Sequence, residues 1–149
     1  MRFTVTAGHN DKDPGNTAGG HREAKLVDDL GHLVALHLRA AGHEVNQDGE
    51  LGENWPLNDA IRLIQGADLA IELHTNASDN PSSRGVEVVA MPSRRREATL
   101  IAEAIAQVLE IPVRRTGGWF DANEHRRARD WNLPAAFVRH GGLIVEVFF

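Results

Sequence analysis

Short apolar runs alternate along this chain with amphipathic segments of helical period, and this alternation constrains the fold more than any other feature. It predicts strands at 3–7, 43–46, 69–73, 85–91, 135–138 and 143–149, and helices at 22–41, 56–65 and 94–110, the last capped by Ser93. Alternation of strands with helices favours parallel pairing, with helices covering the sheet. We therefore expect an α/β fold: a twisted, mostly parallel (mixed) sheet of about six strands with helices on both faces.

Composition narrows the classes of protein and of site that the chain can form. Its 149 residues fit one domain, and no linker or repeat divides them. The chain has no cysteine, so disulfides and thiolate metal sites are excluded, and any transition metal must be held by histidine and carboxylate. A net charge of −5 gives no general attraction for nucleic acid, and we expect none as a partner.

The N-terminus and the hydropathy pattern bear on where the protein acts. The first residues, MRFTVTAGHN, lack the basic and long apolar regions of a signal peptide. No stretch approaches the 18 apolar residues of a membrane-spanning helix. We expect a protein made in the cytoplasm, without an export signal and without stable membrane anchoring.

Polar residues at the ends of the predicted strands are the first candidates for chemistry, because open α/β sheets bind ligands beyond the carboxyl ends of their strands. His9 follows the first strand and His74 ends the run 69–73. Glu23 falls in the first turn of the first helix, and Glu146 lies inside the last apolar strand. The histidines could instead be satisfied by backbone groups, and Glu23 could simply favour the helix dipole. Glu146 is harder to explain structurally, because an unpaired carboxylate in an apolar strand is costly.

Taken together, these residues predict a hydrolytic metal site. Two imidazoles and one carboxylate form a set that holds zinc and leaves a fourth position open for water. Zinc would lower the pKa of that water and polarise a carbonyl group. The remaining carboxylate, on the apolar strand, would serve as the general base.

At these residues the chain resembles the zinc-dependent N-acetylmuramoyl-L-alanine amidases of the amidase-3 type, found among bacterial cell-wall amidases and phage endolysins. The motifs that carry the resemblance are Ala7-Gly8-His9, Asp13-Pro14-Gly15, Glu23, Leu73-His74-Thr75-Asn76-Ala77, Arg84-Gly85-Val86-Glu87 and Ile144-Val145-Glu146-Val147-Phe148. The resemblance implies His9, Glu23 and His74 as ligands of one Zn²⁺ per chain, and Glu146 as the catalytic carboxylate. The family's last motif usually has Gly-Phe one residue after the glutamate, whereas Val147 is here followed by Phe148 and Phe149.

Other polar residues are candidates for contacts around the site or with substrate. Asn76 and Arg139 are expected to support the ligand loop or to touch substrate. Arginines cluster at 94–96 and at positions 126, 127 and 129. These clusters are either a solvated face or a means of pairing a free carboxylate of a stem peptide.

The resemblance implies a peptidoglycan hydrolase that cleaves the amide between N-acetylmuramic acid and the L-alanine of the stem peptide. Residues 1–149 would form the catalytic domain, without a separate cell-wall-binding domain. Because an export signal is missing, we expect a phage or prophage endolysin: a monomer made in the host cytoplasm that reaches the wall in the periplasm with the help of a holin and causes cytolysis. The alternatives are a zinc peptidase that cuts within the stem peptide or cross-link, and a non-catalytic peptidoglycan-binding module.

Overall fold

The computed structural model of the protein describes residues 1–49, 55–125 and 134–149. The candidate arginines Arg126, Arg127 and Arg129 lie outside the described residues. The chain divides into two compact units, Met1–His74 and Thr75–Phe149, and each unit is taken by itself below.

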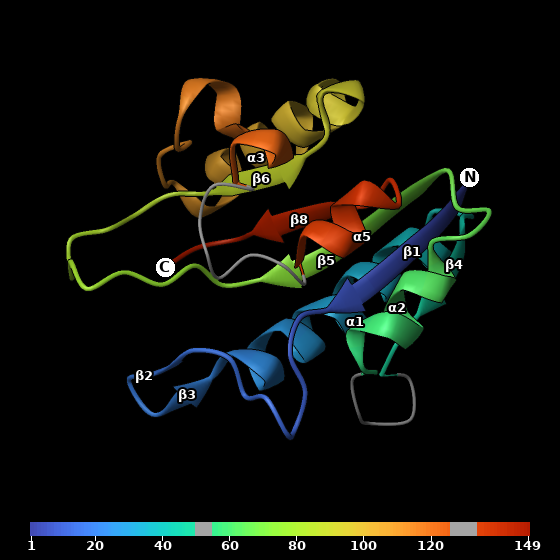
Figure 1. Ribbon diagram of the computed structural model, residues 1–149, viewed down its shortest axis with the longest axis horizontal. Coiled ribbons are helices and arrows are strands. Elements are labelled where there is room, and N and C mark those ends of the chain that lie inside the picture. Colours follow the sequence, from blue (N-terminus) through green and yellow to red (C-terminus); the bar gives the residue numbers. More distant parts are fainter. Residues whose placement is uncertain (50–54, 126–133) are drawn as a thin grey trace. The chain divides into compact units, whose positions relative to one another are not determined.

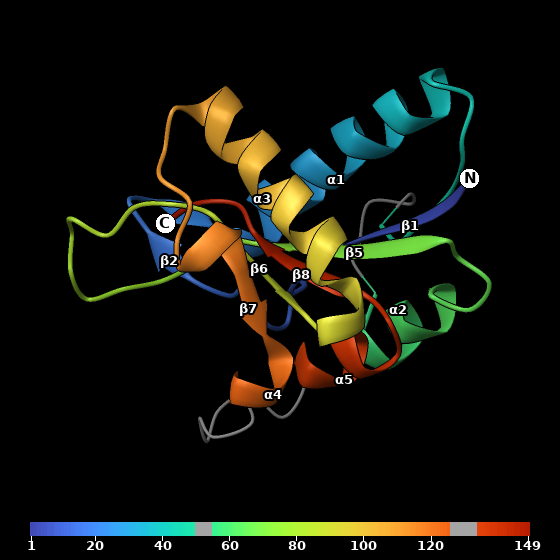
Figure 2. The same cartoon turned by 90° about the horizontal axis from the view of Figure 1, so that it is seen from above.

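The first unit is built on three parallel strands (Figure 1). β1 (Arg2–Ala7) lies between β4 (Glu44–Gln47) and β5 (Leu69–His74) and pairs in parallel with both. The long helix α1 (Glu23–Ala40) and the shorter α2 (Leu57–Leu63) lie on opposite faces of these strands (Figure 2). This is the strand–helix alternation that the sequence pattern predicts.

β1 is buried on both faces, as expected of a central parallel strand. Val5 is fully buried, and so are the two threonines beside it. The hydroxyl of Thr4 donates to the carbonyl of Leu63 at 2.7 Å, and that of Thr6 donates to the carbonyl of Ile71 at 3.3 Å. These bonds satisfy the buried hydroxyls, so the two threonines can be buried in the core without an unpaired polar group.

A two-stranded hairpin precedes α1. It consists of β2 (Thr17–Ala18) and β3 (His21–Arg22), paired antiparallel. The sequence pattern predicts no strand in this segment and places Arg22 at the start of the helix 22–41. The hairpin leads the chain directly into α1, so its end decides where Glu23 lies.

The second unit is centred on β6 (Glu87–Ala90). β6 pairs antiparallel with β8 (Leu143–Glu146) and parallel with β7 (Trp119–Asp121). Helix α3 (Arg95–Leu109) packs on β6 and β7, whereas α5 (Pro134–Arg139) packs on β8. The short elements are the 3₁₀ turns η1 (Pro92–Arg94) and η2 (Thr116–Gly118) and the helix α4 (Ala122–His125).

The α/β class with mixed, mostly parallel pairing is confirmed. Within the two units the described strands form three parallel pairs and one antiparallel pair. Six strands take part, three in each unit, besides the hairpin.

The strand predicted at 135–138 is wrong, because this segment belongs to helix α5. Proline is favoured at the first position of a helix, and Pro134 occupies it. Phe137 and Val138 are fully buried, so an apolar run that resembles a strand is here the inner side of a short helix. The sequence analysis missed β7, a segment for which it predicts neither a strand nor a helix.

The capping role predicted for Ser93 is also wrong. Ser93 lies within the 3₁₀ turn η1, and α3 begins only at Arg95. Arg94 is the residue at the cap position, and no side chain caps the helix there. A 3₁₀ turn before an α-helix is common, and the apolar pattern of the sequence does not distinguish the two.

Within the described part of the chain, no helix combines the length and the apolar character that a membrane crossing requires.

Candidate metal centre

Three predicted site residues, all of the first unit, meet at the carboxyl ends of neighbouring strands. β1 and β5 are parallel, and Ala7 is in register with Leu73. His9 follows β1 after one glycine, His74 is the last residue of β5, and Glu23 is the first residue of α1. The topology therefore brings together residues that lie up to 65 positions apart in the sequence (74 minus 9).

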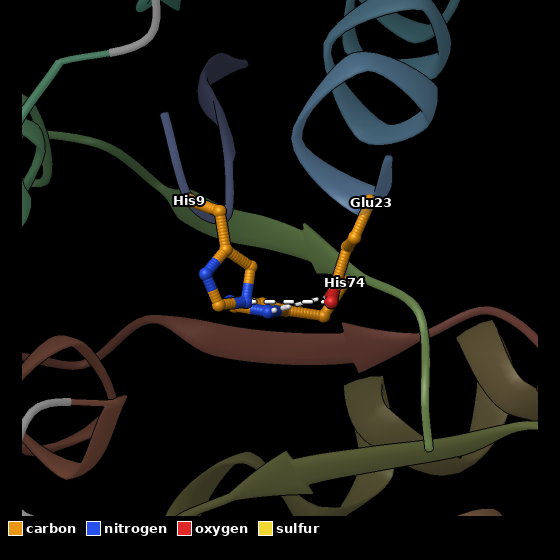
Figure 3. Close-up of side chains that lie close together, drawn as sticks. All are labelled: His9, Glu23 and His74. Atoms are coloured by element: carbon orange, nitrogen blue, oxygen red, sulfur yellow. Dashed lines mark ion pairs between the residues drawn. The ribbon is translucent and has the colours of Figure 1, made fainter. Parts of the chain in front are cut away.

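The carboxylate of Glu23 faces both imidazoles, and these two rings lie next to each other (Figure 3). Its Oε2 is 3.4 Å from Nε2 of His9, and its Oε1 is 3.3 Å from Nδ1 of His74. One candidate ligand atom from each residue lies within 4.8 Å of the others. The side chains of Glu23 and His74 are only 4% and 11% exposed, and that of His9 is 25% exposed, so His9 marks the side of the cluster that solvent reaches.

Two glycines leave the space that these side chains occupy. A Cβ on Gly8 would lie 2.2 Å from Cε1 of His74. A Cβ on Gly15 would lie 2.6 Å from Cδ2 of His9 and 2.7 Å from Oε2 of Glu23, and Gly15 also has a φ of +67°. The backbone N–H of Asn16 donates to the same Oε2 at 2.9 Å. The loop after β1 is therefore shaped around the three side chains.

The chemistry of this donor set fits zinc. Two imidazole nitrogens and one carboxylate are the ligands of catalytic zinc sites that keep a position for water. Burying the charge of a carboxylate such as Glu23 costs free energy unless that charge is paired. A cation held by the carboxylate and the two histidines would offset this cost. The residues present could thus hold the metal that the sequence predicts.

Each histidine has a second carboxylate on its far nitrogen. Nδ1 of His9 is 3.2 Å from Oδ2 of Asp13, whose side chain is 70% exposed. Nε2 of His74 is 3.1 Å from Oε1 of Glu72, whose side chain is 5% exposed. The sequence analysis missed Glu72. Its signal was a glutamate within an apolar strand, two positions before the histidine and therefore on the same face.

A further buried acid, Asp48, lies beside this group. Its Oδ1 accepts a hydrogen bond from the backbone N–H of Ala7 at 3.1 Å. Burial raises the pKa of Asp48 to about 7, and the negative charge of Glu72 contributes to the rise. Asp48 also escaped the sequence analysis, because it lies in a turn after β4 with no motif around it.

Glu146, the predicted catalytic carboxylate, belongs to the second unit. It is the last residue of β8 and is only 9% exposed. It pairs in register with Glu87 of β6, so two buried carboxylates are neighbours across an antiparallel ladder.

Glu87 organises a second cluster of polar side chains in that unit. It accepts a hydrogen bond from Nδ2 of Asn76 at 2.7 Å and one from Nε of each of Arg114 and Arg115, both at 3.3 Å. The two arginines compensate the buried charge, which explains how Glu87 is tolerated. Asn76, predicted from its place after His74, is thus fixed through its amide.

The remaining arginines that the sequence singled out are dispersed. Arg139 is the exposed last residue of α5. Arg94 pairs with Glu97 at 3.0 Å, and Arg95 lies over the ring of Trp119 at 4.9 Å. In the described part of the chain, Arg114 and Arg115 pair with the buried carboxylate of Glu87, and the sequence analysis did not select these two arginines.

Comparison with known proteins agrees with the sequence motifs. Residues 4–143 match the Amidase_3 family, described as N-acetylmuramoyl-L-alanine amidase. The chain belongs to this family. It is thereby a peptidoglycan amidase, a hydrolase of amide bonds, as the resemblance implied. No curated protein sequence gives a match.

Solved structures give the same result. The chain is 35% identical to a protein of Neisseria meningitidis assigned as an N-acetylmuramoyl-L-alanine amidase, covering 99% of this chain and 79% of that one, with a TM-score of 0.87. The fold is shared with the amidase AmiC2 of Nostoc punctiforme at 21% identity, covering 100% and 79% of the two chains, with a TM-score of 0.79. It is shared too with the catalytic domain of the endolysin CD27L, which targets Clostridia difficile, at 24% identity, 100% and 82% coverage and a TM-score of 0.73.

Proposed function

We propose that this amidase is zinc-dependent and cleaves the bond between N-acetylmuramic acid and the L-alanine of the stem peptide. The observation that carries the proposal is the convergence of His9, Glu23 and His74 in a chain of this family. These residues would hold one zinc ion, which supplies a Lewis acid and a water of lowered pKa at neutral pH.

The residues of the site then have separate roles. His9 and His74 bind as neutral imidazoles through the nitrogens that face Glu23, which are Nε2 and Nδ1 respectively. Glu146, by its place in the family motif, accepts the proton of the attacking water and returns it to the nitrogen of the leaving alanine. Glu146 is buried, so bulk water has little access to its carboxylate and competes little for the proton that the carboxylate accepts.

The products of sacculus digestion test the bond that is cut. We expect purified sacculi to release intact stem peptides with new N-terminal alanine. New reducing sugar ends without N-terminal alanine would contradict the amidase assignment. Fragments cut within the stem peptide or cross-link, identified by mass, would favour the alternative of a zinc peptidase.

Replacement of the proposed base separates an enzyme from a binding module. Glu146→Gln should leave zinc binding near the wild-type value and lower the rate of sacculus lysis by at least ~100-fold, because general base catalysis typically contributes 10²–10⁴-fold. Lysis at the wild-type rate by a zinc-loaded Glu146→Gln protein would overturn the mechanism, and a wild type that binds sacculi without releasing peptides would indicate a non-catalytic module.

We also propose that this catalytic domain acts as a monomer in an endolysin role. The support is the fold that the chain shares with the catalytic domain of the endolysin CD27L. The protein would then be made in the host cytoplasm and reach the periplasm when a holin opens the inner membrane. Expression in a Gram-negative host with and without a holin tests this role: lysis only with the holin is expected, and lysis without it would contradict the role.

A further inference from the structure

Behind the three candidate ligands lies a buried carboxylate for which the proposed mechanism gives no task. Glu72 lies on β5 two residues before His74, so both side chains project from the same face of the strand. Its Oε1 is 3.1 Å from Nε2 of His74, the nitrogen on the far side of the ring from Glu23.

We propose that Glu72 is a positioning residue. It accepts a hydrogen bond from the Nε2–H of His74 and thereby keeps Nδ1 of the same ring unprotonated and directed at Glu23, where Nδ1 would bind the metal. The proposal rests on the zinc site of the proposed function. It concerns the affinity of that site, however, and not the bond that is cut. Carboxylates that bind the far nitrogen of a ligating histidine fix its tautomer and raise its basicity.

Burial makes the contact of Glu72 stronger than the corresponding contact of Asp13. Both histidines have a carboxylate on the far nitrogen at nearly the same distance, 3.2 Å for His9 and 3.1 Å for His74. The carboxylate is 70% exposed in Asp13 and 5% exposed in Glu72. Water screens and competes with the first contact, whereas a low local dielectric strengthens the second. The same chain therefore offers a matched exposed control.

The cost of placing Glu72 in the core also indicates a task. A buried carboxylate destabilises a fold unless it is paired, and an apolar residue at the same position of β5 would pack at no such cost. Asp48, also buried, is a second acid beside it, and the charge of Glu72 helps to raise the pKa of Asp48. A residue that only filled space would not need to carry a charge at this buried position.

The test compares zinc affinity in three variants, measured by competition with a chromophoric chelator. Glu72→Leu removes both the charge and the acceptor, Glu72→Gln keeps an acceptor oxygen, and Asp13→Asn makes the corresponding change at the exposed contact. We expect Glu72→Leu to bind zinc about 10–100-fold more weakly than wild type, because loss of an outer carboxylate has effects of this size. The zinc affinity of Glu72→Gln should lie between those of wild type and Glu72→Leu. The zinc affinity of Asp13→Asn should stay within roughly threefold of wild type, as expected for an exposed pair.

Two further readouts separate positioning from a structural role. The metal-free Glu72 variants should unfold at temperatures equal to or above that of metal-free wild type, because a buried charge has been removed. In zinc-loaded wild type, nitrogen-15 NMR should show a proton on Nε2 of His74 that is protected from solvent, and this protection should be reduced in Glu72→Gln. If Glu72→Leu does not fold, the Gln variant carries the comparison.

Zinc affinity of the Glu72 variants within threefold of wild type, or a loss no greater than that of Asp13→Asn, would overturn the inference. A lower unfolding temperature of the metal-free variants with unchanged zinc affinity would assign Glu72 a structural role instead. A wild type that binds no zinc would overturn the proposed function and this inference together. A wild type that binds zinc but releases no stem peptide would overturn only the former, and the ranking of affinities would still decide the latter.

Discussion

His9 adopts a backbone conformation that few residues other than glycine take up, with a φ of 64°. Such a conformation costs free energy and persists only where the surrounding contacts require it. Here the tight turn formed by the mutual backbone hydrogen bonds of Asn10 and Asp13 follows at once, at 2.9 and 3.1 Å. The strained residue is thus a candidate ligand, held in place by the loop that also contains Gly15.

The space left by Gly8 yields a prediction at the same scale. Gly8→Ala should displace the His74 ring, because the added Cβ would lie 2.2 Å from Cε1. We expect a loss of about 1–3 kcal/mol in the free energy of unfolding, typical of overpacking, together with weaker zinc binding. Urea denaturation and a zinc titration measure the two effects.

Gly31, inside α1, is the matched control. A Cβ there would make only ordinary contacts, at 3.8 Å from Leu73 and 3.9 Å from Val5. Gly31→Ala should therefore stabilise the helix by roughly 0.5–1 kcal/mol and leave zinc affinity unchanged. Equal zinc affinities in Gly8→Ala and Gly31→Ala would contradict the steric explanation.

Asp48 makes stability depend on pH. Its pKa is about 7 in the folded protein and near 3.8 in the unfolded chain, so between these values the folded state binds more protons. The free energy of unfolding should therefore fall as pH rises from about 4 to about 7, and the Asp48 contribution should change no further above pH 7. Asp48→Asn should remove this slope and be more stable than wild type at pH 8. Urea midpoints across this range measure the effect, and parallel pH profiles of the two proteins would refute it.

At the scale of elements, the starts and ends of strands and helices decide where the chemistry lies. β1 and β5 end at the same level because they pair in parallel in matching register, and α1 begins directly after the hairpin ends. In α3, the fully buried residues are the small Ala98 and Ala102. Small side chains let the helix approach its strands closely, so its larger apolar residues are left at the flanks, with Val108 79% exposed.

The end of α3 carries a prediction of its own. Glu110 terminates the helix in the left-handed conformation, with φ 53° and ψ 39°. Glycine adopts this conformation without the steric cost that a Cβ brings. Glu110→Gly should raise the free energy of unfolding by about 1 kcal/mol, since the left-handed region costs other residues roughly 1–2 kcal/mol. Thermal unfolding measures the change, and a lower midpoint for the variant would contradict it.

At the scale of the whole molecule, the proposed zinc site predicts a dependence on metal and on pH. Chelation should abolish sacculus lysis, and added zinc should restore it. Acidification should also lower activity, because His9 and His74 must be deprotonated to bind metal. Lysis rates measured with and without chelator, and down to pH ~4, test both; full activity in metal-free protein, or at pH values far below the ordinary histidine pKa of about 6.5, would contradict the site.

Periodicity and motif order alone were enough to predict the α/β class, most of the helices and strands, and the residues that the structure gathers at the ends of β1 and β5. These features are encoded locally: an apolar run predicts a strand, and the residue that follows it lies at the edge where ligands bind. The sequence pattern is ambiguous where a short apolar run is compatible with both a buried strand and a short buried helix. Segment 135–138 has the composition of a strand, yet it packs as part of α5.

Only the tertiary structure decided which groups support the candidate ligands. The approach of Asp48 to Ala7, the pairing of Glu72 with His74, and the two arginines on Glu87 are contacts of side chains whose relative placement no periodic pattern encodes. Their energies depend on burial, which raises both the cost of a charge and the strength of its pairing, and burial exists only once the chain has folded. The sequence by itself therefore determined the fold class and the candidate ligands, whereas the carboxylates behind the ligands came from packing.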